Sequence, residues 1–567
     1  AGDRAQWGAA GICLQVAFGA EDDWARDRWV EWSKTSPAYQ SGDEAEWNQL
    51  SGASKYSPLS FWRIAKEKGY AGKWPFNATQ TRKLLALDFL TDVKILRDQT
   101  DRAYAELSDR DFVEVNSSEF KETVALALYR RDQELPDERA VKGAQMIAAA
   151  LARGTEPEEI ALRFGKNGGK RYVFLADKER NIVEIDEEGW RINNNAPIQF
   201  RKGVGLPMSV ERGALDELLD FLNVDADSMV FLLAWMVTAI INPAGQCPIA
   251  ILDGMAGSAK SSTLSTVVQI VDPKVGALGG NPKSEEDLVV SAYSSAVLSF
   301  DNVTSLAKLS DELCRIATGG GMSKRKQYTD GDVYALDAKR PVILSGIDPT
   351  FYAQDLIERI IRVTLHKPKE YMDDDTFEIV RKEKLPRFRG ALFDLVGIVL
   401  RDVHTIEQST ARFGMFTRVG ESVARHLGYA PGWFAKEYED MRLAIALESS
   451  EADSVYQFLV HHLLGCDNGV GSKVRDTAGR LLMELRDQVR ESPIPIAPSD
   501  IPSNPRVMGA RITACAGLLA KARGWQLSRP DGEIVFEKVR EVAASADDVF
   551  EMARDYQDDA DRKAGIA

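Results

Sequence analysis

A run of eight residues from Gly254 to Ser261 has the residue types and spacing that hold phosphate. Two glycines, Gly254 and Gly257, precede Lys260 and Ser261. Backbone N–H groups of such a loop face an anion together with the positive end of the following helix. The lysine reaches the β- and γ-phosphates and the serine hydroxyl binds Mg²⁺. We therefore expect ATP and Mg²⁺ to bind here.

One position departs from the usual phosphate-loop pattern, because Ala259 stands where the second glycine is expected. A Cβ at this position restricts φ and crowds the phosphate. The predicted nucleotide contacts nevertheless come from this loop and the first turn after it: Gly254, Gly257, Ser258, Ala259, Lys260, Ser261 and Ser262.

A carboxylate suited to the same metal ion follows about forty residues later. The apolar run 296–300 ends in Asp301 and Asn302. Ligands of open parallel sheets lie at the carboxyl ends of strands, so Asp301 is placed to hold Mg²⁺ beside Ser261. An Asx turn after a strand is the alternative for Asp301 alone. Its order and spacing after a phosphate loop favour the metal role.

Three further polar residues extend this constellation. Ser345 ends the strand-like run 340–345 and is a candidate to orient water or contact the γ-phosphate. Arg359 is our candidate arginine finger for a neighbouring subunit's nucleotide, with Arg362 in reserve. For any one arginine, a surface salt bridge is the alternative.

A basic segment lies between the second and third core strands. It carries Lys324, Arg325 and Lys326 after three glycines, and Tyr328 follows. Such a segment is suited to contacting phosphates of a threaded nucleic-acid strand, with the tyrosine stacking on a base. A solvated surface loop is the alternative, and the position inside the nucleotide-binding core favours the DNA-binding role.

Strands and helices that position these residues are readable as local patterns. Apolar runs at 248–252, 296–300 and 340–345 predict strands, and 262–271 predicts a helix. Runs 171–175 and 182–185 predict a hairpin. Asp225 and Asp227 resemble a polymerase D-x-D pair, but next to Ser228 a helix N-cap is favoured. These elements predict a multidomain α/β protein.

Composition sets broad limits. At 567 residues the chain exceeds one core, and its net charge of −15 argues against a wholly basic nucleic-acid coat while leaving room for a local basic surface. Its five cysteines form no C-x-x-C pair, so neither a disulfide framework nor a zinc ribbon is indicated and a reducing cytoplasm fits. The apolar stretch 229–241 is too short to span a bilayer. We expect a cytoplasmic protein of a bacterial host, without membrane contact.

Both ends of the chain carry further signals. Residues 1–75 hold seven of the eleven tryptophans, which predict the core of a small helical domain, with base stacking as the alternative. Near the other end, 505–523 predicts a helix and the strands around 530–532 a hairpin, an arrangement consistent with a winged helix. Arg506 and Arg511 are its candidate DNA contacts.

The order of these motifs resembles the superfamily III, AAA+-type helicase module of primase-helicase replication proteins from phages and other mobile elements. The likeness is carried by 253–262, 298–302, 313–321, 338–347 and 355–359. Residues 20–73 look like the small helical domain that follows the catalytic part of archaeo-eukaryotic-type primases. Two residues depart from the pattern: Asn302 stands where many AAA+ proteins carry a catalytic glutamate, and Ser345 where the sensor is usually asparagine.

The resemblance implies five regions. They are a helical primase-C-terminal-like domain at 1–75, a helical linker plus small β-hairpin domain at 76–212, an AAA+ P-loop ATPase core at 213–400, a helical region with a winged-helix-like domain at 401–540, and an acidic tail at 541–567. Catalytic roles fall on Lys260, Asp301, Asn302, Ser345 and Arg359.

The function that follows is an ATP-dependent, ring-forming helicase or translocase acting on single-stranded or forked DNA, expected as a hexamer. Priming chemistry is not encoded, so a primase domain is expected upstream or on another chain. The main alternative is a nucleotide-switched DNA-binding initiator or helicase loader with slow ATPase. A phosphate-loop small-molecule kinase is a more remote one, since it provides no role for the basic segment.

Overall fold

A computed structural model describes most of the chain beyond residue 92. The described residues are 23–34, 89–90, 93–107, 110–132, 136–202, 205–280, 282, 284–303, 310–319, 322–325, 333–336, 339–346, 354–368, 371–407, 412–451, 453–491, 501–530 and 533–541. The chain divides into two compact units, Ala1–Glu184 with Arg191–Pro207, and Ile185–Trp190 with Met208–Ala567.

The first unit contains a small antiparallel sheet packed on two helices. Its elements are α2 (Asp23–Ser33), β1 (Lys94–Arg97), β2 (Ala103–Glu106), β3 (Phe112–Glu114), α5 (Ser118–Asp132) and α6 (Glu138–Ala152). The sheet has the order β1-β2-β3. Buried residues of the sheet, α5 and α6, including Ala105, Phe120 and Ala144, form one core.

The expectation of a helical linker in the first part of region 76–212 is therefore wrong for β1, β2 and β3. These strands have three or four residues each and carry charged side chains between apolar ones. Runs this short do not separate strand from helix periodicity. Of the N-terminal tryptophans, Trp29 on α2 is buried. Most of the predicted 1–75 domain lies outside the described residues.

Six short strands complete this part of the chain. They are β4 (Ile160–Ala161), β5 (Phe164–Asn167), β6 (Lys170–Phe174), β7 (Ile182–Asp186), β8 (Gly189–Ile192) and β9 (Gln199–Phe200). β4 pairs with β9, and the others form a sheet of order β5-β6-β7-β8. The hairpin predicted at 171–175 and 182–185 is confirmed as β6 and β7.

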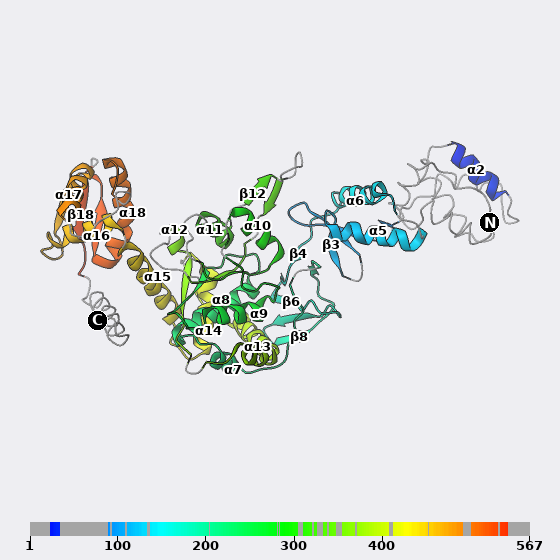
Figure 1. Ribbon diagram of the computed structural model, residues 1–567, viewed down its shortest axis with the longest axis horizontal. Helices are drawn as coiled ribbons and strands as arrows, with labels where there is room; N and C mark the ends of the chain where they lie inside the picture. Colours follow the sequence, from blue (N-terminus) through cyan, green and yellow to red (C-terminus); the bar gives the residue numbers. More distant parts are fainter. Residues whose placement is uncertain are drawn as a thin grey trace. The chain divides into compact units, whose positions relative to one another are not determined.

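The second unit is built on a parallel sheet (Figure 1). Its strands are β10 (Ile249–Asp253), β11 (Leu298–Phe300), β14 (Val342–Ser345) and β15 (Ile360–Thr364), in the order β11-β14-β10-β15. All three neighbouring pairs are parallel. The predicted strands at 248–252, 296–300 and 340–345 are confirmed, and the chain is a mixed α/β protein with a parallel sheet.

Helices enclose this sheet. They are α7 (Leu215–Phe221), α8 (Ala226–Ile241), α9 (Lys260–Val271), α10 (Glu285–Ser294), α11 (Ser310–Thr318), α12 (Gln354–Ile357), α13 (Asp374–Asp402), α14 (Gly414–His426) and α15 (Trp433–Glu451). Alternate strand residues such as Ile249, Ile251 and Leu344 pack in one core with residues of α10, α11, α12 and α15. Period-two alternation sends the intervening residues to the opposite face.

Helix α8 tests two predictions from the sequence, the role of Asp225 and the burial of the apolar stretch 229–241. The Asp225 carboxylate accepts a hydrogen bond from the Ser228 N–H at 3.3 Å, so Asp225 is the N-cap that we predicted. The apolar stretch 229–241 is buried along its whole length. Among the described helices, none combines the length and apolarity needed to cross a bilayer.

The segment between β11 and β14 contains an antiparallel hairpin. Its strands are β12 (Met322–Arg325) and β13 (Val333–Leu336), and Lys324 pairs with Tyr334. The sequence predicted a basic segment after three glycines here, without a strand. The structure instead places the first two basic residues on a strand.

The C-terminal part forms a separate core of helices and an antiparallel sheet. Its elements are α16 (Ser454–Leu464), β16 (Lys473–Asp476), α17 (Ala478–Glu491), α18 (Pro505–Arg523), β17 (Trp525–Ser528) and β18 (Ile534–Lys538), with sheet order β16-β18-β17. The helix predicted at 505–523 and the hairpin after it are confirmed. Residues 542–567 of the predicted acidic tail lie outside the described residues.

Candidate nucleotide-binding site

Candidate residues gather at one edge of the parallel sheet. Gly254 follows the last residue of β10, Asp301 follows β11, and Ser345 is the last residue of β14. The register aligns these ends, since Leu252 is paired with Ser345. The carboxyl edge of a parallel sheet is where ligands of open α/β folds bind.

Loop 254–259 has a backbone that only a few residue types adopt easily. Gly254 has φ 155° and Gly257 has φ 80°. A Cβ on Gly254 would lie 2.6 Å from Ser258 Oγ and 2.9 Å from the Leu365 carbonyl, so this position requires glycine. Ala259 adopts φ 60° and ψ 32°, the left-handed conformation that a glycine would adopt without cost.

The loop leads directly into the N-terminus of α9. Ala259 is the N-cap and supplies no side-chain hydrogen bond to the first turn. The first N–H groups of a helix have no partner within the helix, and the helix dipole makes this end positive. Ser261 and Ser262 are half-buried in the first turn. This geometry suits a bound phosphate.

Lys260 contacts the loop itself in this structure. Its Nζ donates hydrogen bonds to the carbonyl oxygens of Gly254 and Met255, the latter at 3.2 Å. The ammonium therefore lies over the loop, where phosphate oxygens would replace these carbonyls as its acceptors. Ser258 Oγ is buried without a hydrogen-bond partner among the described residues.

Asp301, Ser345 and Asn302 form a hydrogen-bonded group. The Ser345 hydroxyl donates to Asp301 Oδ1, and the Asn302 N–H lies 3.4 Å from Ser345 Oγ. Asn302 Nδ2 lies 3.4 Å from Asp301 Oδ2. Asn302 has φ 52°, a conformation in which asparagine is enriched. Ser345 thus orients the carboxylate that the sequence assigned to Mg²⁺.

A second polar link, which sequence reasoning missed, lies on the other side of the loop. Asp253 Oδ1 accepts a hydrogen bond from the Gly254 N–H at 2.7 Å. Arg362 Nε lies 3.6 Å from Asp253 Oδ2, and its two terminal nitrogens lie 2.9 Å and 2.5 Å from the two Glu448 oxygens. The carboxylate beside the loop glycine was a visible signal, whereas nothing local pointed to Glu448 on α15.

Arg359 lies at the opposite edge of the sheet. Ile249, the first residue of β10, donates its N–H to the Arg359 carbonyl at 2.8 Å. With β10 running parallel to β15, about five residues at ~3.3 Å each separate this level from the loop. Arg359 is therefore not brought together with the phosphate loop of its own chain.

Side chains of the basic segment are not placed. Lys324 and Arg325 belong to β12 by their backbones, and Lys326 and Tyr328 lie outside the described residues. Their predicted contact with nucleic acid stays a prediction.

Tyr371 is a second residue that the sequence did not single out. Its hydroxyl donates a hydrogen bond to the Gly257 carbonyl at 2.8 Å, and Tyr371 itself is exposed to solvent. The two positions are 114 residues apart, so no sequence spacing links them. Tyr371 adds an aromatic ring beside the loop.

The residues present fit ATP and Mg²⁺. The loop offers left-handed backbone positions, an ammonium group and a helix N-terminus for phosphates. Asp301 supplies a carboxylate and Ser261 a hydroxyl, which are oxygen ligands of the kind that Mg²⁺ prefers.

Comparisons with known proteins agree with a replication role. Residues 214–423 match the family model described as actinomycete integrative conjugative element replication protein, and residues 1–65 match Primase C terminal 2 (PriCT-2). No curated protein matches.

Among solved structures, the apo NrS-1 C terminal region (305-718) is 12% identical, with coverage of 81% of this chain and 99% of that chain and a TM-score of 0.38. JCV Helicase with a bound small molecule is 10% identical, with coverage of 41% and 70% and a TM-score of 0.20. These TM-scores are too low to establish a shared fold. The family matches show a replication-related protein with a primase C-terminal segment.

Proposed function

We propose that this replication-related chain is an ATP-dependent DNA helicase or translocase with an AAA+-type P-loop core at 213–400. The observation that carries the proposal is the shared carboxyl edge of the parallel sheet. There a glycine loop with Lys260 follows one strand, and a serine-oriented Asp301 follows another. A phosphate cradle beside a metal-binding carboxylate is the minimum that nucleotide hydrolysis requires.

Each residue has a role in this scheme. Lys260 turns from the loop carbonyls to the β- and γ-phosphate oxygens, and the α9 N-terminus faces the same charge. Ser261 and Asp301 hold Mg²⁺, which neutralises charge on the phosphates when it is bound. Ser345 keeps the Asp301 carboxylate oriented. The side-chain amide of Asn302 is not basic. It therefore positions the attacking water by hydrogen bonding but does not accept the proton of that water.

The proposed assembly is a ring, expected as a hexamer, in which Arg359 acts on the neighbour's nucleotide. Its location at the far edge of the sheet supports action in trans, because it is remote from its own loop. The β12 hairpin and the winged-helix-like module at α16 to β18 are the proposed DNA contacts. The match at residues 1–65 supports association with a primase upstream or on another chain.

The test is Lys260→Ala, with Lys382→Ala as control. Among the described residues, the Lys260 ammonium donates hydrogen bonds to the loop carbonyls of Gly254 and Met255, so its loss leaves the fold intact. We expect ATP turnover to fall by about 10²-fold or more, as when a transition-state donor is removed. Lys382 is exposed on α13 and its replacement leaves turnover unchanged. Undiminished turnover in Lys260→Ala would remove the loop from the mechanism.

A nucleotide-switched initiator or loader is the second candidate, and Asn302 favours it. An amide at the position of a general base gives slow hydrolysis, so that ATP mainly controls assembly. DNA-stimulated turnover and displacement of a strand from forked DNA identify the helicase. Slow turnover without strand displacement identifies the switch.

A further inference from the structure

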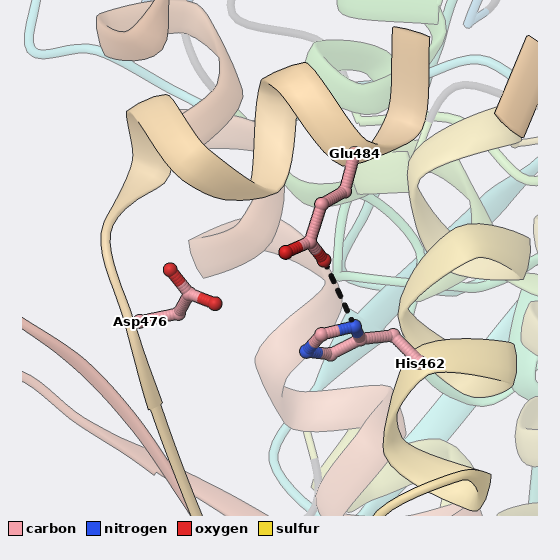
Figure 2. A group of neighbouring side chains, drawn as sticks. All are labelled: His462, Asp476 and Glu484. Carbon is pink, nitrogen blue, oxygen red and sulfur yellow. Dashed lines mark ion pairs between the residues drawn. The ribbon is translucent and has the colours of Figure 1, made fainter. Parts of the chain in front are cut away.

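Three potential metal ligands converge in the C-terminal core, away from the nucleotide loop. His462 lies on α16, Asp476 ends β16, and Glu484 lies on α17 (Figure 2). One ligand atom from each lies within 4.8 Å of the other two. In the part of the chain that the structure describes, these three side chains form the group of potential metal ligands that lie this close together.

One ring nitrogen of His462 contacts a carboxylate, and the other has no hydrogen-bond partner among the described residues. His462 Nδ1 lies 3.3 Å from Glu484 Oε2. The other ring nitrogen, Nε2, is buried and has no hydrogen-bond partner among the described residues. Figure 2 shows this nitrogen on the side of the ring where Asp476 lies. A buried polar atom without a partner lowers the stability of the fold. A metal ion bound to this nitrogen would supply the missing partner.

The carboxylates are held in place by the fold. The Asp476 side chain is only 7% exposed, and its Oδ1 accepts a hydrogen bond from the Thr477 N–H at 2.7 Å. Glu484 extends from the same helix that buries Leu481 and Leu485 in the C-terminal core. The three ligands therefore come from three elements whose positions are fixed by one hydrophobic core.

The spacing fits a small divalent cation. Zinc binds imidazole nitrogen and carboxylate oxygen at about 2.0–2.2 Å, so tetrahedral ligand atoms lie roughly 3.4 Å apart. One ligand atom from each of His462, Asp476 and Glu484 already lies within 4.8 Å of the other two, so small side-chain movements bring them to this spacing. One imidazole and two carboxylates suit the borderline divalent ions, of which zinc binds among the tightest.

Arg480 is the competing partner of these carboxylates. Its Nε lies 3.2 Å from Glu484 Oε1 and 3.8 Å from Asp476 Oδ2. The arginine side chain is 72% exposed, so it can turn into solvent when a cation takes its place. A plain ion-pair cluster is the alternative, and it predicts no metal binding.

We propose that His462, Asp476 and Glu484 bind a divalent transition-metal ion of the zinc class. The ion joins α16, β16 and α17, which stabilises the folded C-terminal core, because the unfolded chain does not hold the three ligands together. A fourth coordination position remains for water or a partner's side chain. This site does not depend on the proposed nucleotide chemistry.

The experiment titrates the full-length chain, stripped with chelator and free of nucleotide, with Zn²⁺ by calorimetry. Co²⁺ replaces Zn²⁺ in a second titration, where visible absorption reports tetrahedral coordination. We expect one ion per chain and a rise in the unfolding temperature of the C-terminal core. His462→Ala and Glu484→Gln should each weaken binding by at least about tenfold. Glu484→Gln keeps the side-chain size and so controls for misfolding.

His461→Ala is the matched control, since His461 is the exposed neighbour of His462 on the same helix. It should bind the ion like the parent. Arg480→Ala should bind more tightly, because the competing guanidinium is gone. Absence of Zn²⁺ binding by the parent overturns the proposal, as does binding that survives both His462→Ala and Glu484→Gln unchanged.

Discussion

Ala259→Gly tests the most unusual backbone position of the proposed phosphate loop. Ala259 has φ 60° and ψ 32° immediately before α9. In this left-handed conformation the Cβ of an L-residue comes too close to the following carbonyl oxygen, at a cost of about 1–2 kcal/mol. Glycine adopts the conformation freely, so the substitution removes this strain from the folded state.

The gain is partly offset in the unfolded chain. Glycine has more unfolded conformations to lose, which costs about 0.4–1 kcal/mol relative to alanine. The net effect of Ala259→Gly is thus a stabilisation of roughly 0–1.6 kcal/mol, obtained by subtracting the second range from the first. Because this net change in stability is close to zero, it does not separate the relief of strain from the change in unfolded-state entropy.

A control in the same loop isolates the strain. Ala256 is exposed to solvent, whereas Ala259 is half-buried, and Ala256 is not among the residues with positive φ. Ala256→Gly therefore brings the same unfolded-state cost with no strain to relieve, and should destabilise by about 0.4–1 kcal/mol. The difference between the two variants cancels the entropy change and equals the strain, about 1–2 kcal/mol.

Hydrogen exchange of the α9 amides, followed by mass spectrometry on the full-length chain, measures this local opening free energy. A difference of about 1–2 kcal/mol appears as roughly a 5- to 30-fold difference in protection between the two variants. A global melting curve is less suitable, because a chain with several cores does not unfold in two states. Equal loss of protection in both variants would refute the left-handed conformation of Ala259.

The remaining predictions concern the proposed chemistry. Ser345→Ala removes a hydrogen bond to a carboxylate, worth about 1.5–3 kcal/mol, so the Mg²⁺ concentration for half-maximal ATP turnover should rise about 10- to 100-fold; an unchanged Mg²⁺ titration contradicts it. Arg359→Ala should bind ATP analogues normally but lose turnover, and mixing it with a variant lacking the phosphate-loop lysine should restore some activity; normal hydrolysis by Arg359→Ala alone excludes the finger. Replacing Lys324, Arg325 and Lys326 by alanine should weaken single-stranded DNA binding and flatten its salt dependence while basal turnover persists; an unchanged salt slope removes the hairpin from DNA contact.

Local patterns in the sequence predicted the sheet and its edge well. Three of the four core strands are apolar runs that end at a distinct polar residue, such as Asp301 after β11 or Ser345 at the end of β14, whereas β15, with Arg362 in its middle, was not predicted. Ala259 was visible as an irregular residue because the loop has a fixed spacing. The left-handed conformation observed there agrees with the sequence argument that a glycine would suit the position better.

Local patterns could not predict contacts between residues that are far apart in the sequence. Tyr371 meets Gly257 across 114 positions, and Arg362 meets Glu448 across 86. The metal-ligand group draws single residues from three elements, with no paired spacing such as C-x-x-C. Only the packing of helices on the sheet brings such residues together, and that packing has no periodic signature in the sequence.

The choice between two candidate arginine fingers shows how the fold adds what the sequence left open. Arg362 lies inside β15, paired with Ile251, and its side chain is 18% exposed while it contacts Glu448 and Asp253 of its own chain. A finger must leave its own subunit to reach a neighbour's phosphate, and Arg362 would first have to abandon two carboxylates. Arg359 precedes the strand, at the edge remote from its own loop. Arg359 therefore remains the candidate for the proposed role in trans, whereas Arg362 lies beside the Asp253 carboxylate that accepts the Gly254 N–H at the start of the loop.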